Sequence, residues 1–370
     1  MRRLIKWEVA FVAFLAGFLM ACGSKPVAQS APAVEQPLFS AIQTIPLIGD
    51  QKAIRLTRRK STDDSKPQIL SVELLPGRGM NVFQIKAHVP GLGVVNLLES
   101  PTLEAARELM NGGANDLNGN ESFKLGGAIL VPFANRIRGR ANHGFILASG
   151  MNSVRTEADN SHAAAFAVLQ AGDFSERWPS KTELSVSATL TDESFGLRVT
   201  ANNTGDEEMP VGIGWHPYFV IPSGNRAQAR IVIPARQRLL VDNYDNALPT
   251  GKMEKVAGTA YDVTVSSGLR LGNSYLDDVF VDLRKDDQGR LEMQVIDQAA
   301  RYGLRLMGLS KEINAVQIYS PADKAFVAIE PQFNFPDPFN PIWKEQNTGM
   351  VILKPGQSVT YGVELMLFVP

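Results

Sequence analysis

The chain has 370 residues, of which 37 are Lys or Arg and 38 are Asp or Glu, so its formal net charge is −1. This balance, with an isoelectric point near 6.5, lacks the basic excess that binds nucleic-acid phosphates, so we expect no nucleic-acid partner. Hydrophobic residues make up 44% of the chain, enough for a large core in one or two domains.

The first residues are typical of an exported protein. Arg2, Arg3 and Lys6 precede an apolar run at 9–20, which is the order of a secretory signal. The run has 12 residues, whereas a membrane-spanning helix needs about 20. We therefore predict a cleaved signal peptide over residues 1–21 and no lasting transmembrane anchor.

The only cysteine of the chain, Cys22, directly follows this run in Leu19-Met20-Ala21-Cys22-Gly23. The stretch resembles the lipobox of bacterial lipoproteins, which implies cleavage before Cys22 and lipidation of that residue. We expect a lipid anchor in the bacterial cell envelope. The outer membrane is slightly favoured, because Gly23 is not the Asp that often retains such proteins at the inner membrane. The alternative is an ordinary secretory signal with an incidental cysteine.

The next segment predicts a tether. Residues 23–46 are rich in Ala, Pro, Ser and Gln and show no sustained periodicity. We therefore divide the mature chain into a flexible tether at 22–46, which starts at the cysteine, and a folded domain at 47–370.

Short segments with alternating apolar and polar residues dominate the predicted domain. The alternation is clearest at 183–190, 197–202 and 291–297. Further short apolar runs lie at 69–75, 82–89, 230–234, 278–283, 304–309, 315–320 and 358–368. One stretch, 102–110, has the spacing of a helix. So many strands with so little helix predict an all-β fold, a large sandwich of antiparallel sheets.

Two candidate proton-transfer residues lie at the ends of apolar runs. Glu330 ends the run FVAIE, where a semi-dry site can tune the proton affinity of a carboxylate. His216 lies among aromatic residues in VGIGWHPYF and can act as an acid or a base. A carboxylate at a strand end is more often simply solvated, and such a histidine is more often structural, so the residues alone leave both interpretations open.

Two further polar clusters are ambiguous when each is taken alone. PFANRIRGR at 132–140 combines Asn and Arg side chains, which in most proteins belong to turns and surfaces. SYLDDVF at 274–280 places two Asp residues at the start of a strand, where they commonly cap or terminate it.

In this order, however, the clusters resemble the aldose 1-epimerase (mutarotase) family. The matching segments are Asn135-Arg136-Ile137, His216-Pro217-Tyr218-Phe219, Leu276-Asp277-Asp278-Val279-Phe280, Glu330-Pro331 with Pro336-Asp337, and Leu353-Lys354-Pro355-Gly356-Gln357. The resemblance extends from about Ile54 to the C-terminus. It implies a galactose-mutarotase-like β-sandwich that interconverts the α and β anomers of a free aldose, such as glucose or galactose, by opening and reclosing the ring.

The resemblance also implies roles for individual residues. Glu330 would be the general base and His216 the general acid. Asn135, Arg136 and Asp277 would hydrogen-bond the sugar and hold it between the two catalysts. Proton transfer of this kind needs no metal and no organic cofactor, so we expect a small-molecule aldose as the only ligand.

One departure from the family pattern concerns a second histidine, which the family carries in a His-Gly-Gly stretch and uses to bind the sugar ring. The nearest counterpart is His162, followed by alanines at both glycine positions. We expect His162 to bind the ring in a pocket reshaped by these alanines, with an ordinary strand residue as the alternative. His88 and His143 match no motif, and we expect them to be structural or exposed.

Three other functions stay open at this point. The chain could be a non-catalytic lipoprotein that binds carbohydrate or a partner protein on the same fold. Asp277 and Glu330 could form a glycosidase-like pair of carboxylates. Arg138 and Arg140 could select a phosphorylated hexose, although export would separate the protein from cytosolic sugar phosphates.

Overall fold

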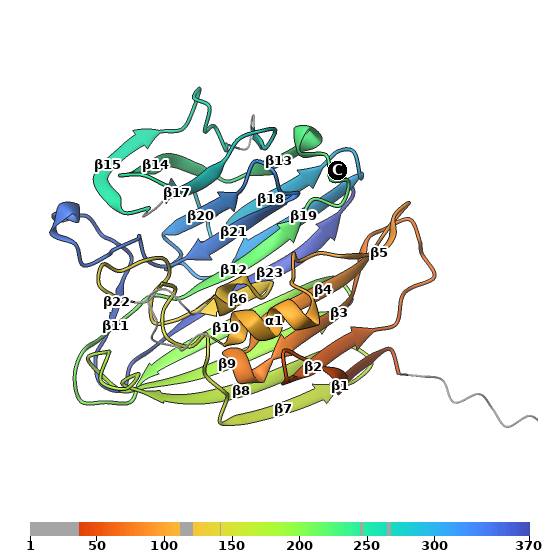
Figure 1. Cartoon of the computed structure of the whole chain (residues 1–370), viewed down its shortest axis with the longest axis horizontal. Coiled ribbons are helices and arrows are strands. Elements are labelled where there is room, and N and C mark those ends of the chain that lie inside the picture. Colours follow the sequence, from red (N-terminus) through yellow and green to blue (C-terminus); the bar gives the residue numbers. More distant parts are fainter. Residues whose placement is uncertain (1–36, 112–120, 141, 245–246, 265–267) are drawn as a thin grey trace, which may run out of the picture. The chain divides into compact units, whose positions relative to one another are not determined.

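Antiparallel β-sheets make up most of the fold in the computed structural model (Figure 1). The structure describes residues 37–111, 121–140, 142–244, 247–264 and 268–370. Within these residues, 37–370 form one compact unit built from a 12-stranded sheet, a 9-stranded sheet and a 2-stranded sheet. The predicted all-β sandwich with very little helix is confirmed.

Strands that are distant in the sequence neighbour one another in each large sheet. In order of neighbours, the 12-stranded sheet contains β1 (Phe39–Ile48), β2 (Gln51–Arg58), β3 (Gln68–Leu75), β4 (Asn81–Val89), β6 (Gly127–Leu130), β12 (Gly214–Val220), β21 (Phe326–Gln332), β20 (Ala315–Ser320), β17 (Leu276–Leu283), β14 (Ala235–Val241) and β15 (Pro249–Lys255), with β5 (Gly93–Asn96) paired to β4. The 9-stranded sheet contains β16 (Leu269–Arg270), β13 (Ala229–Val232), β18 (Leu291–Asp297), β19 (Tyr302–Gly308), β23 (Ser358–Phe368), β10 (Ser194–Asn203), β9 (Thr182–Thr191), β8 (His162–Gly172) and β7 (Ser153–Ala158). The 2-stranded sheet pairs β11 (Met209–Val211) with β22 (Val351–Leu353).

The two large sheets share one apolar core. Leu56 and Val72 of the 12-stranded sheet and Val186 and Leu197 of the 9-stranded sheet belong to the same buried cluster. Buried residues alternate with partly exposed ones along the whole of β9, as its sequence predicts. Burial of each large apolar side chain stabilises the folded state by about 1.5–3 kcal/mol. One face of each large sheet therefore packs in this core, and the opposite face of each sheet does not.

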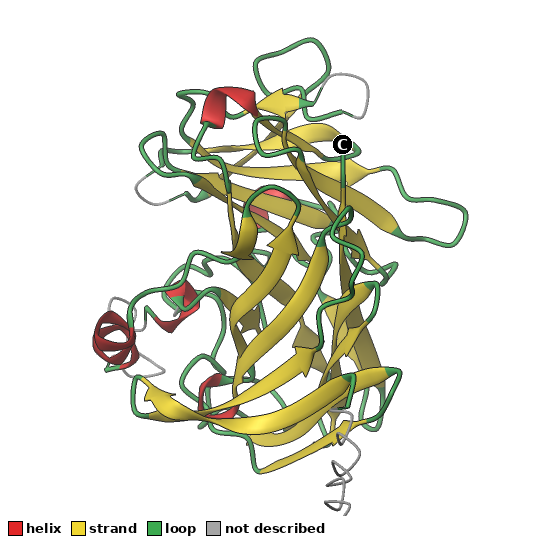
Figure 2. Cartoon of the chain, turned by 90° about the vertical axis from the view of Figure 1, so that its right-hand side faces the viewer, coloured by secondary structure: helices red, strands yellow, loops and turns green. Residues whose placement is uncertain are grey.

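A single α-helix is present among the described residues, α1 (Leu103–Met110), where the sequence predicts one at 102–110. Thr102 caps it, because its Oγ1 accepts a hydrogen bond from the backbone N–H of Ala105. Ala106 and Met110 pack in a small apolar cluster with Ile48. Four short 3-10 helices, η1 (Pro76–Arg78), η2 (Ser122–Lys124), η3 (Arg226–Gln228) and η4 (Pro341–Trp343), complete the elements, and Figure 2 shows that the sheets form the body of the fold.

The N-terminal boundary of the fold differs from the predicted one. Strand β1 begins at Phe39, inside the predicted tether, and the Phe39 side chain is buried in the core. Polar residues and a proline interrupt the apolar pattern here, so its strand character depends on pairing with β2. Cys22, the predicted signal peptide and the first part of the tether, up to residue 36, lie outside the described residues.

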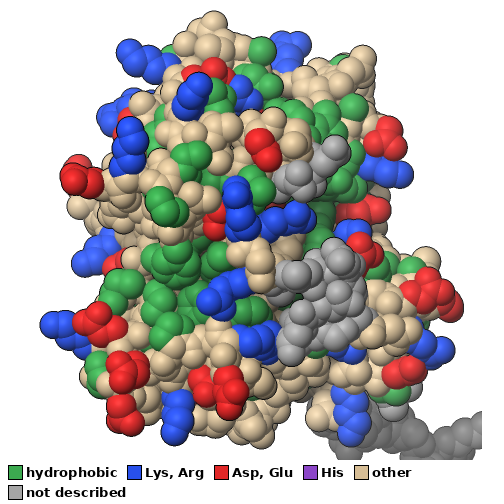
Figure 3. Space-filling view, turned by 60° about the vertical axis from the view of Figure 1, so that its left-hand side comes forward, with side chains coloured by type: hydrophobic (Ala, Val, Ile, Leu, Met, Phe, Trp, Pro, Cys, Tyr) green, Lys and Arg blue, Asp and Glu red, His purple; other side chains and the backbone are tan. Residues whose placement is uncertain are grey.

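Two further features are the distribution of charge on one face of the molecule and the length of its helices. The face drawn in Figure 3 carries both signs of charge around its edge and a small group of Lys and Arg side chains near its centre. No helix within the described part of the chain is long and apolar enough to cross a membrane.

Candidate active site

Three adjacent strands bring together His216, Glu330 and Gln317. Strand β12 lies beside β21, and the pairs Gly214 with Gln332 and Tyr218 with Ala328 set His216 opposite Glu330. Strand β20 follows, and its Gln317 pairs with Glu330. Because successive side chains of a strand point to opposite faces, these three residues share the face that is turned away from the core.

A second row of side chains lies next to the first, two residues along the strands. Tyr218 of β12 is opposite Ala328, and Ala328 is opposite Tyr319 of β20. Tyr319 in turn pairs with Asp277 of β17. Residues more than 100 positions apart in the chain thus meet on one sheet face because the register of four strands aligns them.

Both rows line a cavity of about 250 Å³. The short helix η2 and the loops outside the sheet complete it and contribute Phe123, Lys124, Asn135, Arg136, His143 and Tyr244. The cavity is smaller than the roughly 300–1,000 Å³ typical of sites for drug-sized ligands, so it suits a small molecule. Charged, amide and aromatic side chains converge on it, as the recognition of a polar ligand requires.

The candidate acid and base are in direct contact. His216 Nε2 lies 3.2 Å from Glu330 Oε1, and only 4% of His216 and 1% of Glu330 are exposed. The second carboxylate oxygen, Glu330 Oε2, is buried with no hydrogen-bond partner among the described residues. A buried polar atom without a partner is costly, so this oxygen is ready to accept a hydrogen bond from a ligand.

Burial shifts the pKa of both groups of this pair. It raises the pKa of Glu330 well above the usual carboxyl range, with a further contribution from the charge of Asp277. Burial also lowers the pKa of His216 to about 3. Both shifts disfavour the charged form, so burial favours a neutral carboxylic acid on Glu330 and a neutral imidazole on His216.

The predicted sugar-binding residues Asn135, Arg136 and Asp277 also line the cavity. Asn135 Nδ2 donates to Gln317 Oε1 at 3.5 Å, and Gln317 Nε2 donates to Asp277 Oδ1 at 2.6 Å. Burial and the charge of Asp278 raise the pKa of Asp277 to about 7, while the Gln317 hydrogen bond and the charge of Arg136 oppose that rise. Gln317, which no motif predicted, connects the two sides of the cavity.

The loop that carries Asn135 and Arg136 is held by the segment after β21. Asn334 makes two hydrogen bonds of 3.0 Å to Ala134, accepting from its N–H and donating to its C=O. Three residues farther on, the N–H of Asp337 donates to the C=O of Arg136 at 2.8 Å. The Asn334 amide thus pairs with a loop as a neighbouring strand would and orients the polar side chains that the loop carries.

His143 is another residue of the cavity that the motifs missed. It is buried, lines the cavity, and packs between Phe123 and His216 with ring centroids 4.8 and 4.9 Å away. Burial, followed by the charges of His216 and Arg136, lowers the pKa of His143 well below its usual value. We expected a structural or exposed residue, and the structure shows that it is neither exposed nor remote from the site.

The sequence does contain a signal for His143, namely the glycine that directly follows it. Gly144 follows it with φ +80°, and a Cβ on Gly144 would lie 2.1 Å from the carbonyl oxygen of Val131. Only glycine fits this close approach. The His143-Gly144 pair therefore matches the first two residues of the expected His-Gly-Gly stretch better than His162 does.

His162 is not brought to the cavity. It is the first residue of β8, and Asp159 Oδ1 accepts a hydrogen bond from its backbone N–H at 2.9 Å. Its ring lies 3.1 Å from Asp159 and 3.5 Å from Glu157, on the surface. The alanines that follow are buried strand residues and not a cradle for a ligand. The expectation that His162 binds the sugar ring is therefore replaced by the alternative, an ordinary strand residue.

One set of described residues has the composition of a metal site. His143, His216 and Glu330 each offer one ligand atom, and these atoms lie within 4.8 Å of one another. Two histidines and a glutamate are the donors of some zinc enzymes. The same three groups also suffice for proton transfer to a bound ligand, so this set does not by itself call for an ion.

Comparisons with known proteins bear on the family and the fold of this chain. A family model described as aldose 1-epimerase matches residues 98–365. A galactose mutarotase-like protein from Clostridium acetobutylicum has a TM-score of 0.72 at 18% identity, over 90% of this chain and 99% of that chain. Galactose 1-epimerase from Lactobacillus acidophilus NCFM has a TM-score of 0.62 at 16% identity, over 90% of this chain and 99% of that one. An aldose epimerase homologue from C. elegans has a TM-score of 0.62 at 17% identity, over 81% and 96%. These structural likenesses show the fold.

Proposed function

Because this chain belongs to the aldose 1-epimerase family, we propose that it interconverts the α and β anomers of a free aldose such as glucose or galactose. The observation that carries the proposal is the buried contact of 3.2 Å between His216 Nε2 and Glu330 Oε1 beside the cavity. An acid and a base in contact, within reach of one small ligand, are what reversible ring opening needs.

The reaction moves two protons on each half of its course. Glu330 takes the proton of the anomeric hydroxyl while His216 gives a proton to the ring oxygen, and the bond between the anomeric carbon and that oxygen breaks. Glu330 is then a carboxylic acid and His216 is a neutral imidazole. After the aldehyde rotates, the ring oxygen attacks its other face and both protons return. Each positioned proton transfer contributes typically ~10²–10⁴-fold.

The directions of these two pKa shifts have a consequence for substrate binding. The neutral forms that burial favours, with the proton on Glu330 and not on His216, are those that follow ring opening. Binding of a closed sugar must move that proton to His216. A sugar hydroxyl that donates to the unpartnered Glu330 Oε2 favours this shift, because a hydrogen bond to the charged carboxylate stabilises it.

The remaining polar residues of the cavity hold the sugar. Asn135, Arg136, Gln317 and Asp277 line it together and offer both donors and acceptors to ring hydroxyls. Fixing the anomeric carbon with its two oxygens within reach of the acid and the base removes the orientational freedom that slows the reaction in water.

The test is polarimetry of freshly dissolved α-glucose and α-galactose with protein that lacks the predicted signal peptide. The wild type should speed mutarotation, and Glu330→Gln or His216→Asn should each lower the rate by roughly 10²-fold or more. Glu73→Gln is the matched control, since Glu73 is also a buried carboxyl but pairs with Arg55 away from the cavity.

The opposite outcome is equally informative. A folded wild type that accelerates no aldose in a wide panel would refute the epimerase and favour a carbohydrate-binding protein. Equal loss of activity in Glu73→Gln would show that the variants act through stability.

We also propose that the protein is exported and anchored to the cell envelope by a lipid on Cys22. The support is the order of basic residues, apolar run and lipobox-like stretch at the start of the chain, which lies outside the described residues. Growth of a bacterial host with an alkyne-labelled fatty acid should label the wild type and leave Cys22→Ala unlabelled. An unlabelled wild type in the soluble periplasmic fraction would refute the anchor.

A further inference from the structure

A buried ion pair that the acid–base chemistry does not use lies next to the cavity. Asp278 is 1% exposed and is not among the cavity-lining residues, whereas its neighbour Asp277 is. The two side chains start on opposite faces of β17 because they are consecutive in a strand. Leu276 and Phe280, which share the face of Asp278, belong to the apolar core. A carboxylate at such a position is expensive unless it is paired.

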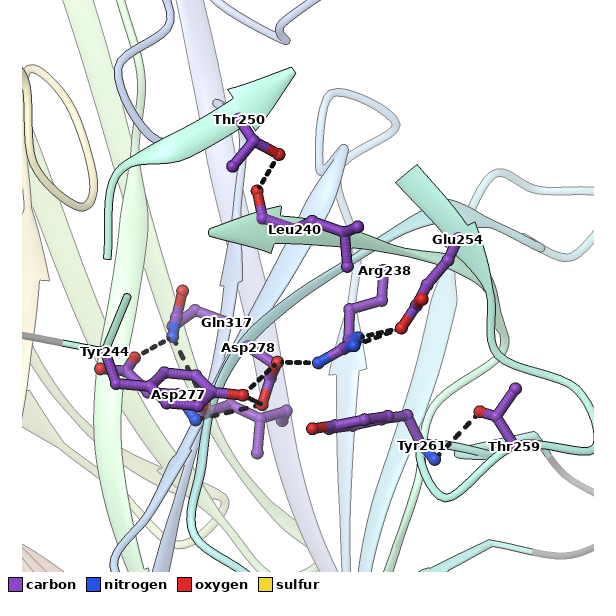
Figure 4. Close-up of polar contacts among 11 residues, drawn as sticks. Arg238, Leu240, Tyr244, Thr250, Glu254, Thr259, Tyr261, Asp277, Asp278 and Gln317 are labelled. Atoms are coloured by element: carbon purple, nitrogen blue, oxygen red, sulfur yellow. Dashed lines mark hydrogen bonds and ion pairs between the residues drawn. The ribbon is translucent and has the colours of Figure 1, made fainter. Parts of the chain in front are cut away.

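Arg238 of β14 is the partner of this carboxylate. Its Nη1 donates to Asp278 Oδ1 at 2.5 Å, and its Nε donates to Glu254 Oε1 at 3.0 Å, as Figure 4 shows. The guanidinium also lies over the ring of Tyr261, 3.4 Å from the centroid. Arg238 is thus fixed on several sides, and it holds the Asp278 carboxylate in one position.

The Asp278 carboxylate in turn contacts two groups that form the cavity. The hydroxyl of Tyr244 donates to it, at 3.1 Å from Oδ1 and 3.3 Å from Oδ2. The backbone N–H of Asp277 donates to Oδ2 at 3.2 Å. Figure 4 shows Tyr244 and Asp277 on one side of Asp278 and Arg238 on the other. The ion pair therefore connects the core of the sandwich to two residues that line the cavity.

We infer that Tyr244 is a substrate-contacting residue of the epimerase, and that Asp278 and Arg238 are positioning residues that hold Tyr244 and Asp277 in place for the sugar. The inference rests on the proposed function. The Tyr244 hydroxyl is occupied by Asp278, so the ring offers the cavity its nonpolar surface. That surface suits the C–H groups of a pyranose, while Asp277 and Arg136 take its hydroxyls.

This arrangement predicts a specific kinetic signature. Neither Tyr244 nor Asp278 has a hydrogen bond to His216 or Glu330 among the described residues, so the proton transfers are not directly affected. Loss of the Tyr244 to Asp278 hydrogen bond should raise KM about tenfold, equivalent to ~1.4 kcal/mol, and leave kcat within about twofold.

The experiment is a double-mutant cycle on Tyr244→Phe and Asp278→Asn, with kcat and KM measured by polarimetry for the sugar that the wild type turns over fastest. Each single variant should raise KM, and the double variant should raise it no further than the stronger single one, because both remove the same contact. Glu73→Gln, which breaks an ion pair remote from the cavity, should leave KM unchanged. Unchanged KM in Tyr244→Phe, or KM increases that simply multiply in the double variant, would overturn the inference.

Two outcomes need a separate readout. If Asp278→Asn does not fold, Tyr244→Phe alone decides, since it deletes one hydroxyl from a side chain that is 38% exposed. If the wild type turns over no aldose, the proposed function fails, and calorimetric titration with glucose and galactose takes the place of kinetics. Binding about tenfold weaker in Tyr244→Phe than in the wild type would then support the inference. Equal binding, or no binding by the wild type, would overturn it.

Discussion

Asp277 shows how the cavity adjusts the chemistry of one side chain. Burial and the neighbouring Asp278 raise its pKa from an ordinary 3.8 to about 7. In the unfolded chain the same carboxyl ionises near its ordinary value. The folded state therefore holds the proton over a pH range in which the unfolded state has released it. Folding loses stability as the pH rises through that range, and the loss is complete above the folded pKa.

This difference predicts a pH-dependent gain in stability for Asp277→Asn. At about pH 3, where both states are mostly protonated, the variant and the wild type should unfold at similar denaturant concentrations. At pH 8 the variant should be more stable, by on the order of a few kcal/mol, because it has no carboxylate to bury. Urea unfolding at the two pH values is the measurement. A stability difference that is the same at about pH 3 and pH 8 would contradict the raised pKa.

A second prediction concerns His143, which lines the cavity, and His162, which the family motif indicated as the sugar-binding histidine. His143→Phe keeps an aromatic ring in contact with Phe123 and His216 but removes both ring nitrogens. We expect KM for the aldose to rise about tenfold, as for the loss of a typical hydrogen bond to ligand. His162→Ala is the control and should leave KM unchanged, since His162 lies on the surface. Polarimetric kinetics on both variants decide, and the reverse pattern would restore the role that the motif first indicated for His162.

At the scale of elements, the site depends on the register of β12, β21, β20 and β17. Glu330 is opposite Gln317, and Tyr319 is opposite Asp277. A shift of one residue in any of these pairings would turn the polar side chains of that strand toward the core. The register is stable because the opposite face of each strand, with residues such as Trp215 and Ile329, is buried between the sheets.

The contact between Asn334 and the loop before Arg136 can be tested separately. Asn334→Ala removes both hydrogen bonds to Ala134 and should cost roughly 1–3 kcal/mol for each backbone group left unsatisfied. We expect KM to rise as well, because Arg136 loses its position, while kcat stays near the wild-type value. Thermal unfolding and polarimetric kinetics measure the two effects.

Asn203→Ala is a matched control for this variant. Asn203 is also buried, and its Nδ2 donates to the C=O groups of Glu207 and Leu353 at 2.7 and 2.8 Å, away from the cavity-lining residues. It should lower the melting temperature in a similar way without changing KM. If both variants raise KM equally, Asn334 acts only through stability.

At the scale of the whole molecule, one core supports a site on the outer face of one sheet. Leu197 of β10 is fully buried in that core and belongs to the sheet that carries none of the cavity-lining residues. Leu197→Ala should therefore destabilise the protein by about 2–5 kcal/mol while the folded fraction keeps its KM. Ile352→Ala, at a side chain that is 51% exposed, should be nearly neutral. Urea unfolding with parallel kinetics checks both, and a change of KM in Leu197→Ala would show that the core and the cavity are coupled.

The sequence by itself determined the fold class and most of the site. Period-two alternation predicts strands such as β9, β10 and β18 because it records which side chains face the core, and this pattern is local. The order of short motifs indicated His216, Glu330, Arg136 and Asp277 as a set, and the structure brings these residues to one cavity.

Only the tertiary structure decided the rest, because contacts between distant segments leave little local signal. It moved the start of the fold to Phe39, since β1 is defined by pairing with β2. It put His143, and not His162, in the cavity, because a loop held by Asn334 and a glycine with positive φ carries His143 there. It also gave Asp278 a partner in Arg238, from a strand 40 residues away. Alternation states which face a side chain takes, whereas the packing of the strands decides which side chains meet.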